Sequence, residues 1–363
     1  MRAGERVAIL TGGGDCPGIN AVIRAVVKKA TRERSLEVIG IEDGYEGLIE
    51  NKHRPLAYDD VAGILTLGGT ILGTSNTANP YSYAVKENGE LLFKDRSSAV
   101  LRNVEELNIS CLVCIGGDGT LSIASSLFQQ GVPVVGIPKT IDNDLRGTDI
   151  TFGFNTAVEI ATEGIDRIHT TAQSHHRVMI VEVMGRDAGW IALNAGIAGG
   201  GDIILIPEIP FRIDSIARKV QERSKKGRRS SIIVVAEGAR PKGGGTVTRR
   251  LVPESTDPVR LGGVGFVLGQ QIEEVAGIET RTVVMGHLQR GGVPTAFDRT
   301  LATRLGTKAV DLIGNHQFGT MVGVKGDTLV SVPLSIAAGG VRVVPLDHPL
   351  IQSARSVGTC FGD

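Results

Sequence analysis

The stretch RVAILTGGGDCPGINAVIRAVVKKATRE, residues 6–33, decides how the chain begins to fold. Residues 6–10 are mainly apolar and predict a buried β-strand, and glycines follow at once. From residue 19 the apolar side chains recur at helical spacing, with Val22, Ala25 and Val26 on one face. A strand, a glycine turn and a helix together form the unit from which parallel α/β sheets are built.

The same alternation of short apolar runs with helix-period segments continues along the chain. Strands that are apolar throughout and alternate with helices predict parallel sheets covered on both faces. We therefore predict an α/β fold of two Rossmann-like, doubly wound domains with mainly parallel sheets and an active site in the cleft between them. The further strands predicted are 111–116, 132–138, 177–185, 202–208, 231–238 and 280–287, and the further helices are 120–131, 155–170, one from about 188, 214–226 and 296–313.

Composition narrows the function classes. The 363 residues suffice for two domains, and 41% hydrophobic with 21% charged residues is typical of a globular protein. A formal net charge of zero and 4% aromatic residues argue against nucleic acid as the main partner, since binding it requires a basic face. The start of the chain does not resemble a secretory signal, and no stretch approaches the about 20 apolar residues of a membrane span. We therefore expect no membrane association and a cytoplasmic location.

The four cysteines do not predict a metal or redox site. Cys111 and Cys114 lie three residues apart on a predicted strand, so their side chains should point to opposite faces. Cys16 and Cys360 have no other cysteine near them in the sequence. We expect all four to be structural or incidental.

Two glycine clusters directly follow predicted strands, TGGGDCPG at 11–18 and GGDGT at 116–120. Glycine allows close backbone approach, so adjacent N–H groups can surround a phosphate, although a tight strand-to-helix turn explains each cluster equally well. Neither matches the P-loop or the dinucleotide fingerprint. Asp118 would repel a phosphate unless a divalent cation lay between them, so the second cluster favours Mg²⁺-nucleotide chemistry.

A third polar segment, IPKTIDNDL at 137–145, follows the strand predicted at 132–138. It brings Lys139, Asp142 and Asp144 together at the end of a buried strand. A polar turn is one interpretation. The other is a site where a proton is removed and negative charge is stabilised.

Taken in order, the motifs resemble those of the 6-phosphofructokinases, from residue 6 to about 313. GGDGT also occurs in lipid and NAD kinases, but TIDND, MGR and HLQRGG do not belong to those sites. The resemblance implies phosphoryl transfer from ATP, with Mg²⁺, to the 1-hydroxyl of fructose 6-phosphate, the committed step of glycolysis. The motifs that carry it are GGGDCPGINAVIR (12–24), GGDGT (116–120), PKTIDNDLRGTD (138–149), VEVMGRDAGW (181–190), PE (207–208), VAEGA (235–239) and GHLQRGG (286–292).

The resemblance also implies a role for each matching residue. Asp142 is the general base, oriented with Thr140 and Asp144, and Lys139 and Arg186 complete the catalytic set. Asp118 holds Mg²⁺. The phosphoryl donor is expected to contact Gly14, Gly117, Asp118, Gly119 and Thr120. The sugar phosphate is expected to contact Thr140, Asp142, Arg177, Met184, Gly185, Arg186, Glu237, Arg281, His287 and Arg290.

The resemblance further implies an oligomer and a division of labour between domains. Arg177 and Arg281 match positions that a neighbouring subunit supplies, in a homodimer or homotetramer. We expect a larger, donor-binding domain at 1–153 plus about 289–345, and a smaller, fructose 6-phosphate domain at about 154–288 plus the C-terminal segment. An aspartate is intrinsically a weak base, and we expect repulsion from Asp144 to raise the pKa of Asp142.

The phosphoryl donor is the main ambiguity. Gly119 is typical of ATP enzymes, whereas Lys139 is typical of pyrophosphate enzymes, a mixture that resembles a mixed-substrate bacterial subgroup. An aspartate at 119 would exclude ATP, while a lysine can swing away, so we favour ATP and keep a reversible pyrophosphate enzyme as the alternative. ATP-dependent relatives usually have arginine where this chain has Asn76, and we expect Lys139 to replace that cation.

The remaining expectations concern regulation, alternative functions and two segments of the chain. Allosteric relatives bind an effector phosphate through several arginines. Of these this chain keeps Arg24, and the positions that match the others hold Lys28, Tyr58 and His169. We therefore expect a weak or absent response to ADP or phosphoenolpyruvate. A non-catalytic sugar-phosphate-binding subunit is a less favoured alternative, and a related acceptor such as sedoheptulose 7-phosphate stays open. The glycine-rich segment 241–263 is expected to be mobile, and the last 20 residues show no clear pattern.

Overall fold

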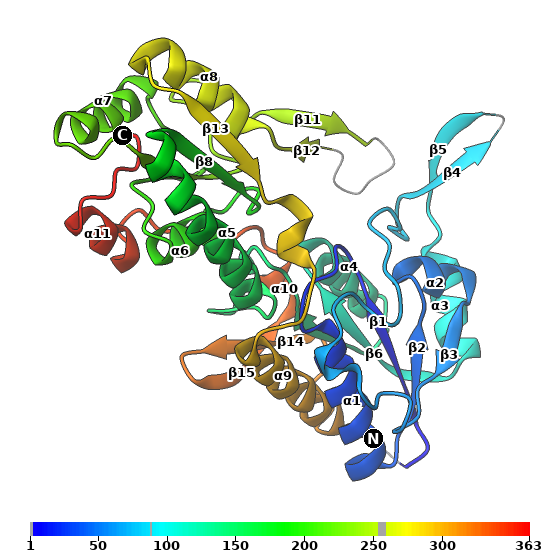
Figure 1. Ribbon diagram of the computed structural model, residues 1–363. Coiled ribbons are helices and arrows are strands. Elements are labelled where there is room, and N and C mark those ends of the chain that lie inside the picture. The colour runs from blue at the N-terminus through cyan, green and yellow to red at the C-terminus, as the bar shows by residue number, and fades with distance from the viewer. Residues whose placement is uncertain (1–2, 88, 253–258) are drawn as a thin grey trace.

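The computed structural model describes residues 3–87, 89–252 and 259–363. Two mainly parallel sheets, each with helices packed on it, form two lobes (Figure 1). The predicted α/β architecture is confirmed. We call the lobe built on the seven-stranded sheet the larger lobe and the one built on the four-stranded sheet the smaller lobe.

The larger lobe has the strand order β15-β14-β7-β6-β1-β2-β3. Its five inner strands run parallel, and the two edge strands β3 and β15 are antiparallel to their neighbours. The strands are β1 Arg6–Thr11, β2 Glu37–Ile41, β3 His53–Pro55, β6 Ile109–Gly116, β7 Val134–Pro138, β14 Thr320–Lys325 and β15 Thr328–Pro333.

The smaller lobe has the order β13-β8-β10-β9, and all its strands are parallel. Two antiparallel ribbons, β4–β5 and β11–β12, project from the lobes. Every predicted strand is present, although 202–208 and 280–287 are shortened. The strands are β8 Val178–Val183, β9 Ile203–Leu205, β10 Ser231–Ala236, β13 Thr280–Val284, β4 Tyr83–Glu87, β5 Glu90–Lys94, β11 Thr248–Leu251 and β12 Val259–Leu261.

The helices confirm those predicted, and the one predicted at 155–170 continues to His175. Within the described ranges, none is both long and apolar enough to cross a membrane. The helices are α1 Ile19–Arg34, α2 Tyr45–Glu50, η1 Ile64–Thr66, α3 Ser97–Glu106, α4 Asp118–Gln129, α5 Phe154–His175, α6 Trp190–Ala198, α7 Ile213–Lys225, α8 Val264–Ala276, η2 Gly286–Arg290, α9 Ala296–Gly314, α10 Leu334–Ala337 and α11 Pro349–Ser356.

The two lobes share one hydrophobic core. Val7 and Ile9 of β1 enter the same buried cluster as Val181 of β8, and helices α1, α5, α6 and α9 contribute to it. The opposite face of each sheet packs into a cluster of its own. Cys111 and Cys114 fall in different clusters, so the expectation that they point to opposite faces is confirmed. The sheets do not fix where one domain ends, and the domain boundaries stay a prediction.

Two segments differ from what the sequence suggested. Strands β11 and β12 pair within the segment expected to be mobile, and residues 253–258 of that segment lie outside the described residues. The C-terminal residues are ordered by tertiary contacts: the His348 side chain caps α11, and Phe361 is fully buried. The few buried side chains of the last 20 residues lie on a short helix and in irregular segments, and this is why the sequence showed no clear pattern there.

Helix packing makes Gly306 a sensitive position. An added Cβ there would lie 2.8 Å from the carbonyl oxygen of Val22 and 2.8 Å from the Cβ of Ala25, both on α1. Alanine normally stabilises a helix by about 1 kcal/mol relative to glycine. We expect Gly306→Ala to reverse this sign and destabilise the protein by about 1–3 kcal/mol, because the backbone cannot yield.

Thermal unfolding checks this expectation. Gly164→Ala in α5 is the matched control, because its added Cβ would meet only the flexible end of Met285. The Tm should fall for Gly306→Ala and change little for Gly164→Ala. Equal Tm values for both variants would contradict the packing argument.

Candidate active site

A cavity of about 950 Å³ lies where the carboxyl ends of the strands of both sheets meet. Loops after β1, β6 and β7 line it from the larger lobe, and loops after β8, β10 and β13 line it from the smaller lobe. It brings together most residues predicted from the sequence: Gly14, Gly117, Asp118, Gly119, Thr120, Lys139, Thr140, Asp142, Asp144, Met184, Arg186, Glu237, His287 and Arg290. Gly185, Arg177 and Arg281 do not line it.

Close contacts explain the glycines of the first two loops. A Cβ at Gly12 would lie 2.5 Å from Oγ1 of Thr120, and one at Gly116 would lie 2.3 Å from its Cβ. Thr120 is buried and therefore packs the two loops together, in addition to its predicted contact with the donor. A Cβ at Gly14 would overlap the Arg290 guanidinium at 1.5 Å, so only glycine fits there. Gly119, by contrast, faces open space.

The loop after β7 holds its two carboxylates by local hydrogen bonds. The Thr140 hydroxyl accepts from the backbone N–H of Asp142 at 3.0 Å. Asn143, between the carboxylates, has a left-handed backbone with φ 54°, which asparagine tolerates better than most residues. Its Oδ1 accepts from the N–H of Thr151 at 3.0 Å. The two carboxylates are thus attached to a backbone whose shape is set by the loop itself.

Burial is the main cause of the altered acidity of these carboxyl groups. Within the part of the chain that is described, Oδ1 of Asp142 is buried and accepts no hydrogen bond. Burial raises the pKa of Asp142 to about 6, and Arg290 partly opposes this. Burial, followed by the charges of Asp142 and Asp118, raises the pKa of Asp144 to about 7. We expected repulsion from Asp144 to raise the pKa of Asp142; the raised pKa is confirmed, but burial is its first cause, and the repulsion acts at Asp144, whose pKa Asp142 raises.

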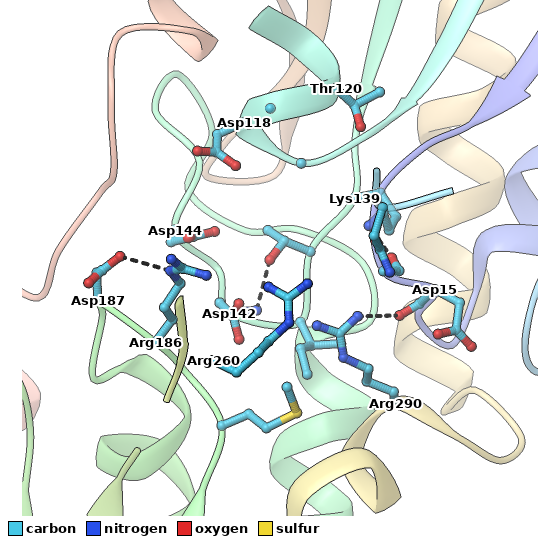
Figure 2. Close-up of a pocket in the computed structure, with 18 of the residues that line it drawn as sticks. Asp15, Asp118, Thr120, Lys139, Asp142, Asp144, Arg186, Asp187, Arg260 and Arg290 are labelled. Carbon is cyan, nitrogen blue, oxygen red and sulfur yellow. Dashed lines mark hydrogen bonds and ion pairs between the residues drawn. The ribbon is translucent and has the colours of Figure 1, made fainter. Parts of the chain in front are cut away.

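Four cationic side chains lie around the carboxylates in Figure 2: Lys139, Arg186, Arg260 and Arg290. Lys139 is 4% exposed, and its ammonium donates to the carbonyl of Gly14. Burial lowers the pKa of Lys139 while Asp142 raises it. Arg290 reaches the loop after β1, where its Nη1 lies 3.5 Å from the carbonyl oxygen of Asp15. Its guanidinium thus lies against the loop expected to contact the donor, and its role at the 6-phosphate stays a prediction.

Arg186 enters the cavity from the turn after β8. Its backbone is left-handed with φ 45°, its N–H donates to Glu237 at 3.3 Å, and its Nε pairs with Asp187 at 3.2 Å. Gly185 has φ 136°, and a Cβ there would meet the carbonyl oxygen of Ala188 at 2.6 Å. Gly185 therefore shapes the turn that aims Arg186. Burial raises the pKa of Glu237 to about 7.

Sequence reasoning missed Gln289, which lies between His287 and Arg290 in the same motif. Gln289 is fully buried, and its Oε1 accepts from the N–H of Met184 at 2.8 Å. It joins η2 to the turn after β8 and so fixes two walls of the cavity. A polar residue inside a recognised motif was the available signal.

Sequence reasoning also missed an arginine-bearing ribbon. Arg249, Arg250 and Arg260 of β11–β12 line the cavity, and Figure 2 shows Arg260 pointing into it. Consecutive strand residues normally face opposite ways, but the register shifts between Thr248 and Arg250. The base of the ribbon is held by Glu182, a buried carboxylate that accepts from the N–H groups of Gly263 and Gly265 at 2.8 Å each. Three arginines in a short segment were the signal.

Arg177 and Arg281 lie away from the cavity. Arg177 pairs with Glu279 at 2.6 Å, and Arg281 contacts the same carboxylate. Strand β13, which carries Arg281, is an edge strand of the smaller sheet. Their assignment to a neighbouring subunit's site stays a prediction.

The residues expected at a vestigial effector site have partners of their own. The Lys28 ammonium lies 3.5 Å from the centre of the Tyr58 ring, and Nε2 of His169 lies 2.6 Å from the carbonyl oxygen of Gly199. Arg24 is half-buried on α1. The expected weakness of regulation is not tested by these contacts and stays a prediction.

The cavity can therefore hold polyanionic ligands and remove a proton beside them. Glycine loops leave backbone N–H groups accessible, arginines and a lysine supply positive charge, and a carboxylate of raised pKa lies among them. Aligned reactants, cations and one base are what phosphoryl transfer requires.

Comparison with known proteins agrees with this chemistry. A family model described as phosphofructokinase matches residues 6–313. The chain is 50% identical over 365 residues to ATP-dependent 6-phosphofructokinase 2 of Clostridium perfringens, covering 100% of both chains. It is 52% identical over 340 residues to a pyrophosphate–fructose 6-phosphate 1-phosphotransferase of Amycolatopsis methanolica, covering 94% of this chain and 96% of that one.

Solved structures give the same fold. The phosphofructokinase of Pichia pastoris in the T-state superposes with a TM-score of 0.79 and 32% identity, covering 93% of this chain and 36% of that longer one. A pyrophosphate-dependent phosphofructokinase from Nitrosospira multiformis superposes with a TM-score of 0.80 over 99% of this chain and 93% of its own, at 19% identity. The second likeness bears on the fold alone.

Proposed function

The chain belongs to the phosphofructokinase family, and we infer that it transfers a phosphoryl group from ATP to the 1-hydroxyl of fructose 6-phosphate. The products are fructose 1,6-bisphosphate and ADP. The observation that carries this inference is one cavity that joins two glycine loops to a buried base, Asp142, and to the cationic side chains of Lys139, Arg186 and Arg290. This arrangement also argues against the non-catalytic alternative, because a binding subunit needs no base.

Asp142 is proposed to accept the proton of the 1-hydroxyl as that oxygen bonds to the transferred phosphorus. The bond between this phosphorus and the bridging oxygen breaks, and the electron pair leaves with ADP. Burial favours the neutral acid and so makes the carboxylate a better base. Lys139, Arg186 and Arg290 are proposed to stabilise the negative charge of the transferring group.

The residues present fit a magnesium ion held jointly with the donor. No cluster of three or more His, Cys, Asp or Glu side chains suited to a metal is found among the residues described. Mg²⁺ in phosphoryl-transfer sites usually takes only one or two carboxylates and completes its shell with phosphate and water. Asp118, which lies close enough to Asp144 to raise its pKa, is the proposed ligand. Bound Mg²⁺ supplies charge neutralisation on the phosphates.

The choice of donor follows from the space at Gly119 and from the position of Lys139. Nothing lies within 4 Å of a Cβ built at Gly119, so room remains beside it for a nucleotide phosphate. The Lys139 ammonium donates to the Gly14 carbonyl, and no atom of Lys139 lies within 4 Å of that Cβ. We therefore propose ATP as the donor. Pyrophosphate is the second candidate because a relative that is 52% identical is named for it.

An oligomeric enzyme is the further proposal that the site supports. Fructose 6-phosphate carries a phosphate at the end opposite the reacting hydroxyl, and His287 is an exposed, adjacent partner for it. Arg177 and Arg281 lie outside this chain's cavity but on one face of the smaller lobe, paired with Glu279. We propose that they complete the site of a neighbouring subunit in a homodimer or homotetramer. The cytoplasmic location stays an expectation from the sequence.

One assay tests the function directly. The purified protein is given fructose 6-phosphate, Mg²⁺ and either ATP or pyrophosphate, and formation of fructose 1,6-bisphosphate is measured. Higher kcat/KM with ATP supports the proposal. Higher kcat/KM with pyrophosphate makes the protein the reversible enzyme, and binding without turnover would favour the non-catalytic subunit. Sedoheptulose 7-phosphate as acceptor tests the remaining alternative.

The pKa of Asp142 predicts the pH dependence. A carboxyl with a pKa of about 6 is protonated below that pH and cannot accept a proton, so kcat/KM should fall below about pH 6. Asp142→Asn should lower kcat by at least about 100-fold and remove this acidic limb. Glu163→Gln, on the exposed face of α5, is the control and should leave the profile unchanged. An unaltered acidic limb in the Asn variant would exclude Asp142 as its source.

The space at Gly119 predicts how donor choice can be changed. Gly119→Asp places a negative charge beside the nucleotide phosphates and should lower kcat/KM with ATP by at least about 100-fold, because such like-charge contacts cost several kcal/mol. Gly119→Ala adds only a Cβ in open space and should change it little. Equal losses in both variants would show that bulk, not charge, decides.

Lys139 is proposed to replace the arginine that is absent at Asn76, which lines the same cavity. Lys139→Gly should lower kcat with ATP by more than about threefold, because a cation leaves the transferring group. Lys242→Gly, a surface lysine outside the cavity, is the control. A kcat within about threefold of wild type would rule out this role.

A further inference from the structure

We call the loop after β7, residues 139–145, the catalytic loop. The segment after α10 runs beside this loop and contacts both lobes. Val341 forms an antiparallel bridge with Leu145, and the N–H of Arg342 donates to the carbonyl of Asp144 at 2.6 Å. Two residues later, the N–H of Val344 donates to Glu208 at 2.8 Å. We call residues 341–344 the C-terminal strap.

Glu208 and Trp190 receive the strap on the smaller lobe. The Glu208 carboxylate also accepts from the N–H of Gly189 at 2.9 Å, so it joins the strap to the start of α6. The indole N–H of Trp190, whose side chain is almost fully buried, donates to the carbonyl of Arg342 at 2.9 Å. The strap is therefore hydrogen-bonded to the catalytic loop on one side and to α6 on the other.

The Arg342 side chain hydrogen-bonds to the catalytic loop at Asn143, the residue with a left-handed backbone. Its Nη2 donates to the carbonyl of Asn143 at 2.8 Å and to that of Asp149 at 3.0 Å. Its guanidinium lies 4.4 Å from the centre of the Trp190 ring. Asn143 is the left-handed residue between the two carboxylates, and the guanidinium holds the carbonyl of the Asn143–Asp144 peptide that follows it.

These contacts suit arginine and not lysine. The planar fork donates to two carbonyl oxygens while its face stacks on an aromatic ring, and an ammonium cannot do both. The charge also lies close to ionisable groups. Burial lowers the pKa of Arg342, and Asp149 and Asp144 partly oppose this; burial and then the charge of Arg342 lower the pKa of His348.

We propose that Arg342 is a positioning residue for the reaction. It holds the Asn143–Asp144 peptide in place and connects that peptide to α6 of the smaller lobe through Trp190. Acceptor activation thus depends on how the smaller lobe sits against the catalytic loop. This role rests on the proposed function, since it concerns the base of that reaction, and Arg342 does not itself line the cavity.

Steady-state kinetics of Arg342→Met and Arg342→Lys test the proposal. A displacement of about 1 Å at a catalytic group lowers the rate up to about 100-fold, so kcat of the Met variant should fall about 10- to 100-fold. The KM for fructose 6-phosphate should change less than about threefold, because the sugar contacts are untouched. The Lys variant should lose less activity, since it keeps the charge but not the fork.

The pH profile separates positioning from general damage. The acidic limb belongs to Asp142, and the Arg342 guanidinium donates to backbone carbonyls. A positioning role therefore predicts a lower kcat with the wild-type limb kept in both variants, whereas general damage that exposes Asp142 would move the limb to lower pH. Arg355→Met is the matched control: this arginine of α11 stacks on Phe361 and pairs with Asp363, away from the catalytic loop. Its kcat and pH limb should equal those of wild type. Trp190→Phe, which removes the indole N–H, should lower kcat in the same direction by a smaller factor.

The outcomes distinguish this role from the proposed function. A wild type inactive with both ATP and pyrophosphate would overturn the function and with it the role of Arg342. An active wild type with full kcat in Arg342→Met would overturn the role alone. If the Met variant does not fold, the Lys and Trp190→Phe variants decide, and wild-type kcat in both, or a loss confined to KM, would overturn it.

Discussion

The withdrawal of two carboxyl groups from water is the constraint on which the rest of the site depends. Burial makes Asp142 and Asp144 harder to ionise, and only nearby cations keep such groups in place without a large loss of stability. Lys139 and Arg290 approach from different elements and meet at the loop after β1. The same desolvation that disfavours the charged base gives it a pKa suited to proton transfer near neutral pH.

The site also requires side chains to pack directly against the backbone of its loops, and particular glycines make this possible. Arg290 can lie against the first loop only because residue 14 has no Cβ, and Thr120 can join two loops only because residues 12 and 116 have none. Gly119 differs, since nothing contacts it. Glycine is thus used for packing at three positions and for open space at the fourth, a distinction that matters because only the fourth bears on donor choice.

The lobes are not independent bodies joined by a linker. One hydrophobic cluster runs through α1, α5, α6 and α9 and reaches both sheets, while the strap at 341–344 adds hydrogen bonds on the far side of the catalytic loop. Since the cavity is lined from both lobes, its shape depends on this shared core. A carboxylate in one lobe and a residue proposed to bind phosphate in the other keep their separation through packing, not through direct contact.

The sequence by itself determined the α/β order, the strands that end at the site and most of the residues gathered there, because apolar periodicity and local motifs are encoded by neighbours in the chain. It also carried the family resemblance. Tertiary structure alone decided the rest: that burial is the first cause of the raised pKa of Asp142, that Arg260 enters the cavity, and that Arg342 reaches the loop after β7 from a distant segment. Desolvation and long-range contacts depend on what the fold brings together, and no local pattern records them.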